Sequence, residues 1–273
     1  MYVVATPLGN LQDMSLRALA VLRAVDAVAC EDTRHSQRLL DAFGIKTRLV
    51  ALHEHNEQAA AGLVIRMLEE GKQVALITDA GTPAVSDPGA RAVARVQDAG
   101  FPVVPVPGAS AVITALSASG LADGHFHFHG FLPKSAARRA SLESLRSVPG
   151  TLVFYEAPHR IAETLDDLAA VFESARELVV ARELTKMFEQ IVRMPITEGP
   201  AWLAADPNRA RGEFVLLVSA APVAEGLSPE AERVLGLLLA ELPVKQAAKL
   251  AAGITGESKN ALYERALELR DEG

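Results

Sequence analysis

The sequence predicts an α/β protein with two α/β domains, residues 1–120 and 121–222, and a small helical appendage at residues 226–273. Three observations support this class. Short apolar runs alternate with longer helical patterns, as a largely parallel sheet covered on both faces requires. The 273 residues exceed the usual size of one domain. Finally, 49% of the residues are hydrophobic, and Gly and Pro are spread along the chain, which is typical of a folded globular protein.

Five apolar runs in the first domain predict strands, and helical segments separate them. The predicted strands are residues 2–5, 27–30, 49–52, 74–78 and 102–105. Ser15 is placed to cap the first helix, Ser36 to open the second, and Asn56 precedes the third. This alternation predicts an open α/β sheet, and ligands of such sheets bind beyond the carboxyl ends of the strands.

The second domain is predicted to be α/β as well, with strands that need not all be parallel. Its predicted strands are residues 125–130, 151–155, 178–182, 188–194 and 214–219, and its main helices are residues 136–146 and 161–172. The appendage is predicted to hold three helices, residues 228–241, 244–252 and 257–269. The last two, with a Gly-containing turn between them, look like a helix-turn-helix.

The charge and the cysteine content limit the function classes. The formal net charge is −7, so any contact with a nucleic acid must come from a local basic patch. Cys30 is the only cysteine, which excludes an intramolecular disulfide. The first residues carry no cationic leader, and their apolar run is too short for a signal or a membrane span. We therefore expect a cytoplasmic protein that does not enter a membrane.

One strand, residues 74–78, ends abruptly in a loop of small and polar residues before the next helix. Ala80 and Gly81 would let a ligand approach the backbone, and Asp79 could accept a hydrogen bond from a ribose hydroxyl or an amino group. Thr82 and Ser86 add hydroxyl groups. The alternative is a plain turn in which Asp87 caps the following helix.

Two similar loops, residues 6–11 and 106–111, follow the first strand and the strand at residues 102–105. Three such loops at one sheet edge would form a concave site for a ligand with polar ends and an aromatic or apolar middle. The chain has neither a GxGxxG fingerprint nor a GxxxxGK[ST] phosphate loop, which argues against a kinase or a nucleotide hydrolase.

Eight motifs, in order along most of the chain, resemble a known family. They are VATPLGNL (4–11), CEDTR (30–34), TDAGTP (78–83), VPGAS (106–110), GFLPK (130–134), FYEAPHR (154–160), ARELTK (181–186) and GEFV (212–215). This set resembles the tetrapyrrole methylase superfamily, and within it the branch that methylates a cytidine 2'-hydroxyl of 16S ribosomal RNA.

The resemblance implies a two-domain, tetrapyrrole-methylase-like (class III methyltransferase) fold and an S-adenosylmethionine-dependent enzyme. S-adenosylmethionine would lie between the domains, and the protein would be a homodimer that acts on 16S ribosomal RNA in the 30S subunit. The implied cofactor contacts are Leu8, Asp79, Ala80, Gly81, Thr82, Ser110 and Ala111 in the first domain, with Tyr155 and the Arg182 region in the second.

The densest basic stretch of this acidic protein lies in the second domain. We assign RNA phosphate contacts to Lys134, Arg138, Arg139 and Arg160, although a solvated helix face is the alternative. The candidates for a general base are Glu156, His159, Glu183 and Lys186, because they flank the presumed cleft. Each of these could equally be a member of a structural ion pair.

Three alternatives remain open at this stage. His125, His127 and His129 would share one face of a strand, a spacing compatible with a metal site, but no Cys or carboxylate pattern completes one and no metal is expected. The same fold and cofactor could serve a tetrapyrrole, another small molecule or a protein side chain. Lastly, the chain could be a nucleic-acid-binding module that works through its C-terminal helices.

Overall fold

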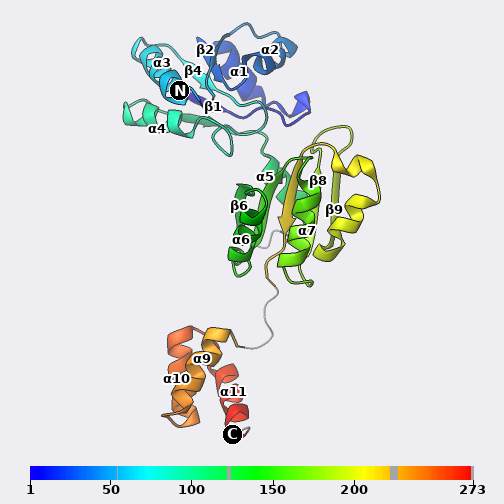
Figure 1. Cartoon of the computed structure of the whole chain (residues 1–273). Coiled ribbons are helices and arrows are strands. Elements are labelled where there is room, and N and C mark those ends of the chain that lie inside the picture. The colour runs from blue at the N-terminus through cyan, green and yellow to red at the C-terminus, as the bar shows by residue number, and fades with distance from the viewer. Residues whose placement is uncertain (54, 122–123, 222–226, 272–273) are drawn as a thin grey trace. The chain divides into compact units, whose positions relative to one another are not determined.

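The computed structural model describes residues 1–53, 55–121, 124–221 and 227–271, which form two compact units, Met1–Ala221 and Pro222–Gly273. The first unit contains two five-stranded sheets, and the second contains three helices (Figure 1). The predicted class, an α/β protein with a small helical appendage at its C-terminal end, is confirmed. The domain boundaries near residues 120 and 222–226 stay predictions.

The first sheet is parallel throughout, with the strand order β3-β2-β4-β1-β5. Its strands are β1 (Tyr2–Val4), β2 (Ala27–Cys30), β3 (Arg48–Ala51), β4 (Val74–Leu76) and β5 (Val104–Val106). Because all pairs are parallel, the five carboxyl ends lie at the same edge, where the three small-residue loops begin.

Helices cover both faces of this sheet. They are α1 (Leu16–Ala24), α2 (Thr33–Ala42), α3 (Glu57–Glu69) and α4 (Ala90–Asp98), with a short 3-10 turn η1 (Leu11–Asp13) before α1. Successive residues of β2 point to opposite faces, so that Ala27 and Ala29 join one buried cluster and Val28 and Cys30 join another. The near-continuous apolar strands are therefore explained by burial on both sides.

The start of α2 differs from the prediction. Ser36 does not open this helix, because Asp32, four residues earlier, caps it. The Asp32 carboxylate accepts hydrogen bonds from the N–H groups of Arg34 at 2.7 Å and His35 at 3.3 Å. Ser36 lies buried within the helix instead. The predicted cap at Ser15 is confirmed, since its hydroxyl accepts from the N–H of Ala18 at 3.1 Å.

The second sheet is mixed, with the order β6-β7-β10-β8-β9. Its strands are β6 (Phe126–Phe131), β7 (Thr151–Glu156), β8 (Glu177–Arg182), β9 (Gln190–Pro195) and β10 (Phe214–Val218). Only β6 and β7 are parallel; β10 pairs antiparallel with both neighbours, and β8 with β9. All five residues of β10 are buried, as expected of a central strand.

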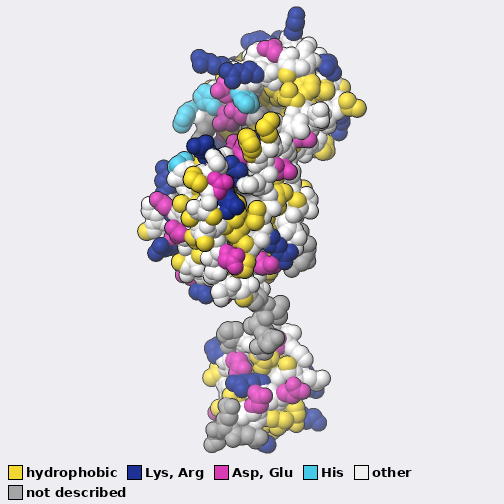
Figure 2. Space-filling view, turned by 90° about the vertical axis from the view of Figure 1, so that its right-hand side faces the viewer, with side chains coloured by type: hydrophobic (Ala, Val, Ile, Leu, Met, Phe, Trp, Pro, Cys, Tyr) yellow, Lys and Arg dark blue, Asp and Glu magenta, His cyan; other side chains and the backbone are white. Residues whose placement is uncertain are grey.

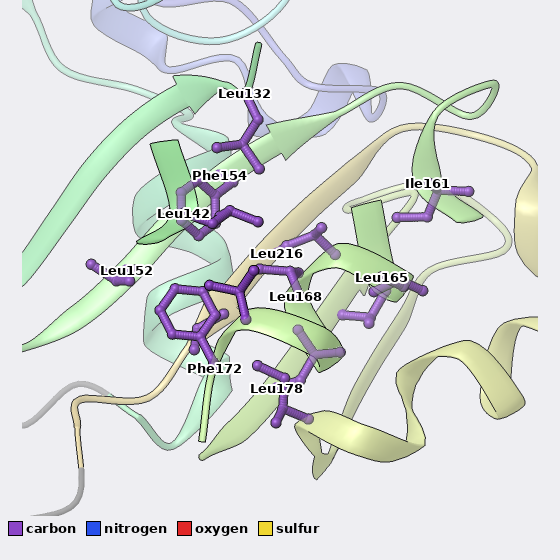
Figure 3. Close-up of a cluster of buried hydrophobic side chains, with 14 of the residues drawn as sticks. Leu132, Leu142, Leu152, Phe154, Ile161, Leu165, Leu168, Phe172, Leu178 and Leu216 are labelled. Atoms are coloured by element: carbon purple, nitrogen blue, oxygen red, sulfur yellow. The ribbon is translucent and has the colours of Figure 1, made fainter. Parts of the chain in front are cut away.

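Helices also cover both faces of the second sheet. They are α5 (Ala111–Ser119), α6 (Ala136–Ser144), α7 (Ile161–Val171) and α8 (Gly199–Ala204), with the 3-10 turns η2 (Ile196–Glu198) and η3 (Pro207–Ala210). Figure 3 shows the core on one face, where Phe154 and Leu216 meet Leu165 and Leu168 of α7. On the other face α5 packs through Val112 and nearby apolar residues. Burial of apolar side chains on both faces thus stabilises the second sheet.

The second unit is a bundle of α9 (Pro229–Leu239), α10 (Val244–Thr255) and α11 (Lys259–Asp271) (Figure 1). Its core contains many alanines, among them Ala247, Ala248 and Ala251 of α10, and such small residues let the helices approach closely. Gly256 ends α10 in the left-handed conformation, with φ of 76°. In the part of the chain that the structure describes, no helix is both long and apolar enough to cross a bilayer.

Candidate active site

A cavity of about 400 Å³ lies between the carboxyl edge of the first sheet and the strands β7 and β10 of the second. The first sheet contributes Leu8, Asp79, Ala80, Gly81, Thr82, Val85, Ser86, Asp87, Ser110 and Ala111 to its wall, and the second half of the unit contributes Phe131, Tyr155, Glu156, Ala157, Pro158, Leu184, Glu213, Phe214 and Val215. This size is typical of a small-molecule site.

Hydrogen bonds join the three loops at the sheet edge. The backbone of Thr6 exchanges two hydrogen bonds with Gly81, at 2.8 and 3.0 Å, and the Thr6 hydroxyl donates to the carbonyl of Thr78 at 3.0 Å. The Thr82 hydroxyl donates to the carbonyl of Ala109 at 3.0 Å. Gly81 has φ of 86°, and a Cβ there would lie 3.3 Å from Leu8 Cδ2. The three loops therefore lie together at the sheet edge, as the sequence predicts.

One polar atom of the cavity wall has no partner in the structure. Asp79 lines the cavity, and its buried Oδ1 makes no hydrogen bond. A buried polar group without a partner costs about 1–3 kcal/mol, so such atoms point to a ligand that supplies hydrogen-bonding groups. The apolar side chains of Leu8, Ala111 and Val215 form the remainder of the wall. The cavity therefore fits a ligand with a polar end and an apolar body.

The structure brings together eight of the nine residues expected to contact the cofactor. The residues from Leu8 to Ala111 in that set, and Tyr155, all line the cavity. Arg182 does not line it. Its side chain is buried at the end of β8, where Nε donates to the carbonyl of Arg211 at 2.5 Å and one terminal nitrogen lies 3.3 Å from Gln190 Oε1. These contacts give Arg182 a structural role.

Among the four candidate bases, only Glu156 lines the cavity, and both of its carboxylate oxygens are engaged. Oε1 accepts from the N–H of Ala157 at 2.8 Å and lies 3.2 Å from Arg160 Nε, while Oε2 accepts from the Thr164 hydroxyl at 2.6 Å. The carboxylate is fully buried among these partners. His159 is exposed and lies outside the cavity wall. Glu156 has no free oxygen to accept a proton, and His159 is not in the cavity wall, so neither residue is placed to act as the base.

Glu183 and Lys186 pair with each other beside the cavity wall. Lys186 Nζ lies 2.9 Å from Glu183 and 2.8 Å from Glu213. Burial lowers the pKa of Lys186, but the two carboxylates outweigh it and raise that pKa, so the ammonium stays protonated. Burial likewise raises the pKa of Glu183, but Lys186 and the N–H of Glu213 outweigh it and lower the value. The arrangement is a structural cluster and not a proton acceptor.

The four candidate RNA contacts differ in exposure. Lys134 is exposed, and Arg139 has 65% of its side chain exposed although it pairs with Asp167 at 2.5 Å. Arg138, in contrast, is 3% exposed and bonds Asp167, Thr164 and Glu163 at 2.5–3.2 Å. Its guanidinium group has no face left for a phosphate, so the expectation that Arg138 contacts RNA is not supported by its position.

Arg160 occupies an intermediate position. One terminal nitrogen donates to the carbonyls of Leu132 at 2.6 Å and Pro133 at 3.0 Å, and its Nε pairs with Glu156. The side chain thus ties the turn after β6 to the end of β7. Phe131, which begins that turn, is 55% exposed and lies in the cavity wall, with its ring 5.6 Å from that of Tyr155. Arg160 therefore positions the cavity rim.

The histidine row of β6 shows no sign of a metal centre. The rings of His127 and His129 stack 6.5 Å apart, and His129 stacks on Phe154. Within the described ranges, no group of three His, Cys, Asp or Glu side chains is arranged to hold a metal ion.

Comparison with known proteins identifies the family. The family model for tetrapyrrole (corrin/porphyrin) methylases matches residues 1–199. The chain belongs to the tetrapyrrole methylase family. This tetrapyrrole methylase also matches, over residues 225–270, the model described as the RsmI C-terminal HTH domain. The family and the helix-turn-helix-like appendage predicted from the sequence are thus confirmed.

Two curated relatives extend over nearly the whole tetrapyrrole methylase chain. A "Ribosomal RNA small subunit methyltransferase I" from Pseudomonas aeruginosa is 55% identical, with 98% of this chain and 96% of that protein covered. A protein of the same name from Escherichia coli O157:H7 is 51% identical, with 98% and 94% covered.

Solved structures show the same fold at lower identity. A cobalt precorrin-4 methyltransferase of cobalamin biosynthesis is 19% identical, with a TM-score of 0.59 over 80% of this chain and 93% of that one. A diphthine synthase is 18% identical, with a TM-score of 0.60 over 80% and 88%. At these identities the likeness establishes the fold alone.

Proposed function

We propose that this protein is an S-adenosylmethionine-dependent methyltransferase that methylates the ribose 2'-hydroxyl of a cytidine in 16S ribosomal RNA. The observation that carries the proposal is the 55% identity, over 98% of the chain, to a protein named Ribosomal RNA small subunit methyltransferase I. The cavity of this chain combines the unpartnered Oδ1 of Asp79 with an apolar wall, as a small ligand with a polar end requires.

The cavity fits S-adenosylmethionine. The unpartnered oxygen of Asp79, in the cavity wall, suits a donor group of the ribose or the amino acid end. Leu8, Ala111 and Tyr155 offer apolar surface for the adenine and the methylene groups. When bound, S-adenosylmethionine supplies a methyl group on a positively charged sulfur, which is open to attack by an oxygen in line with the bond that breaks.

The protein's main task in such a transfer is alignment and exclusion of water. Tyr155 is held by Phe128 at 4.9 Å and Phe131 at 5.6 Å between ring centroids, so its ring has a defined position in the wall. Phe131 is half exposed at the same wall. An exposed aromatic ring at the rim suits stacking of an unpaired base, which is how proteins read single-stranded RNA.

Basic side chains for the RNA backbone are available near this rim. Lys134 and Arg139 follow Phe131 and are exposed. Figure 2 shows Lys, Arg and His side chains, with Asp and Glu side chains among them, in the upper part of the Met1–Ala221 unit. Local basic groups of this kind supply phosphate contacts even in a protein whose formal net charge is −7.

The remaining expectations are part of the same proposal. The enzyme acts on the 30S subunit, in the cytoplasm, as a homodimer. The large exposed side chains of Leu16, Met187 and Phe188 are 85%, 90% and 68% exposed, and they offer apolar surface for a second copy. Light scattering at working concentration tests this, and a monomer would contradict it.

The test of function uses purified protein, radiolabelled S-adenosylmethionine and 30S subunits from cells that lack the modification. Nuclease digestion and mass spectrometry then identify the labelled nucleoside. We expect 2'-O-methylcytidine. Label in no nucleoside, with S-adenosylmethionine still bound, would overturn the RNA assignment and direct the search to a tetrapyrrole or a protein side chain.

A further inference from the structure

The loop between β4 and α4 holds an unusual backbone. Ala84 and Ser86 have φ of 66° and 63°, although neither is glycine. Each such residue costs about 1–2 kcal/mol, and this cost persists only where the surrounding structure enforces it. A Cβ added at Gly130 of β6 would lie 3.0 Å from Ser86 Oγ, so the loop presses against the strand that leads to Phe131. The loop therefore lies against β6 beside the cavity, in a conformation that its surroundings enforce.

Asp87 lies in this loop, and it does not cap the helix that follows. The N-terminus of α4 is capped by Glu57 of α3, whose Oε1 accepts from the N–H groups of Gly89 at 3.0 Å, Arg91 at 2.9 Å and Ala92 at 3.2 Å. Glu57 is 7% exposed. Because a residue 32 positions away performs the capping, the alternative of Asp87 as a helix cap is wrong, and its carboxylate is free for another role.

The surroundings of Asp87 favour a proton acceptor. It lines the cavity and is half-buried. Burial raises the pKa of the Asp87 carboxyl, the charge of Asp79 raises it further, and the nearby Thr78 hydroxyl opposes both. Tyr155 faces it from β7, and burial and then the charge of Asp87 raise the pKa of that phenol. No cation pairs with Asp87 among the residues that the structure describes.

The other carboxylates of the cavity wall are less suited to this role. Glu156 is saturated by Ala157, Arg160 and Thr164. Glu213 is neutralised by Lys186 at 2.8 Å. Asp79 Oδ1 is buried in the cavity wall, where it is better placed to accept a hydrogen bond from a bound ligand than to accept a proton and release it to water. Asp87 is the remaining described wall carboxylate, and it has no cation to hold its charge.

We propose that Asp87 is the general base that accepts the proton of the ribose 2'-hydroxyl during methyl transfer. This role rests on the proposed function. The 2'-oxygen forms the new bond to the methyl carbon while the bond between that carbon and sulfur breaks. The electron pair of the broken bond stays on sulfur, which becomes a neutral thioether. The hydroxyl proton passes to a carboxylate oxygen of Asp87, which later releases it to water.

The experiment compares wild type, Asp87→Asn and Asp98→Asn in the full-length chain. Asp98 is an exposed residue at the end of α4 and serves as the matched control. The readouts are the single-turnover rate of methyl transfer to unmodified 30S subunits at several pH values, and the dissociation constants of S-adenosylmethionine and S-adenosylhomocysteine by calorimetry.

For Asp87→Asn we expect a rate about 10²- to 10⁴-fold lower, loss of the acid limb of the wild-type pH–rate profile, and both affinities within about twofold of wild type. Asp98→Asn should match wild type throughout. A weaker affinity for S-adenosylmethionine alone would make Asp87 a partner of the sulfonium charge, and weaker affinity for both ligands would make it a cofactor contact. Either result, or a rate within about tenfold of wild type, overturns the proposal. Absence of transfer by the wild type itself would instead overturn the proposed function.

Discussion

Lys134 and Arg138 lie four residues apart in one basic stretch, yet their surroundings assign them different roles. Lys134 is exposed, whereas Arg138 is 3% exposed and bonded to three side chains of α7. The identity of a basic residue does not reveal whether acidic partners from another helix already surround it. The structure therefore leaves Lys134 and Arg139 as the candidates for phosphate contacts in this stretch.

The two residues should respond differently to substitution. Lys134→Ala should weaken binding to 30S subunits about fivefold and leave the free energy of unfolding unchanged. The slope of log affinity against log salt concentration should become shallower by about one, as expected for the loss of one phosphate contact. Arg138→Met should instead lower the free energy of unfolding by about 3 kcal/mol, because Asp167 loses a buried partner. Filter binding at several salt concentrations and urea unfolding check both. Equal loss of RNA affinity in both variants would contradict the distinction.

The lowered pKa of Glu173 predicts how the free energy of unfolding depends on pH. Burial alone would raise the pKa of this carboxyl, but a backbone N–H and the guanidinium groups of Arg146 and Arg176 outweigh it and lower the pKa from 4.5 to about 2. Since the folded state has the lower pKa, the unfolded state binds the proton more readily. The stabilisation is therefore present above pH 4.5 and is lost as the pH falls toward 2.

Glu173→Gln should consequently destabilise the protein at pH 7 and make little difference near pH 2. Urea unfolding of both proteins across this pH range measures the effect. A destabilisation of the same size at both pH values would show that the ion pairs with Arg146 and Arg176 are not its cause.

At the scale of elements, the cap on α4 joins two helices and shapes the cavity loop. The Glu57 carboxylate accepts three backbone N–H groups at 2.9–3.2 Å at the positive end of the α4 dipole. Local sequence suggested a cap from within the loop. The structure supplies one from α3, which leaves Ser86 and Asp87 beside the ligand.

Glu57→Ala should lower the free energy of unfolding by about 2 kcal/mol and weaken S-adenosylmethionine binding, because the loop before α4 loses its anchor. Glu69→Ala, an exposed substitution at the other end of α3, is the control and should change stability by less than about 0.5 kcal/mol. Chemical denaturation and calorimetry measure both. Unchanged affinity for S-adenosylmethionine in Glu57→Ala would show that the cap does not position the cavity loop.

At the scale of the molecule, the cavity lies wholly within the Met1–Ala221 unit, and the helices of the second unit have their own core. Several basic side chains of α10 and α11 are exposed, among them Lys245, Lys249 and Lys259. This division suggests that the second unit contributes to substrate binding and not to the cofactor site.

Deletion of the residues after Leu227 should therefore weaken binding to the 30S subunit and leave S-adenosylmethionine affinity within about twofold of the full chain. Calorimetry with the cofactor and filter binding with the subunit measure the two effects. Equal loss of both affinities would refute the division of labour.

The sequence by itself determined the fold class, the family and the loops that meet at the sheet edge. These follow from local patterns: apolar periodicity sets strands and helices, and short motifs such as TDAGTP (78–83) carry the small residues that a ligand requires. Eight of the nine expected cofactor contacts line one cavity for that reason.

Only the tertiary structure decided which charged side chains are free. Arg138 bonds Asp167 across 29 positions of the chain, and Glu57 caps a helix 32 positions away. Arg182 is held by Arg211, which is also 29 positions distant. Burial and ion pairing depend on such contacts between distant segments, and these contacts decide whether a titratable group is neutralised or left beside a ligand. Asp87 became a candidate base because the folded chain supplies a different residue for the cap.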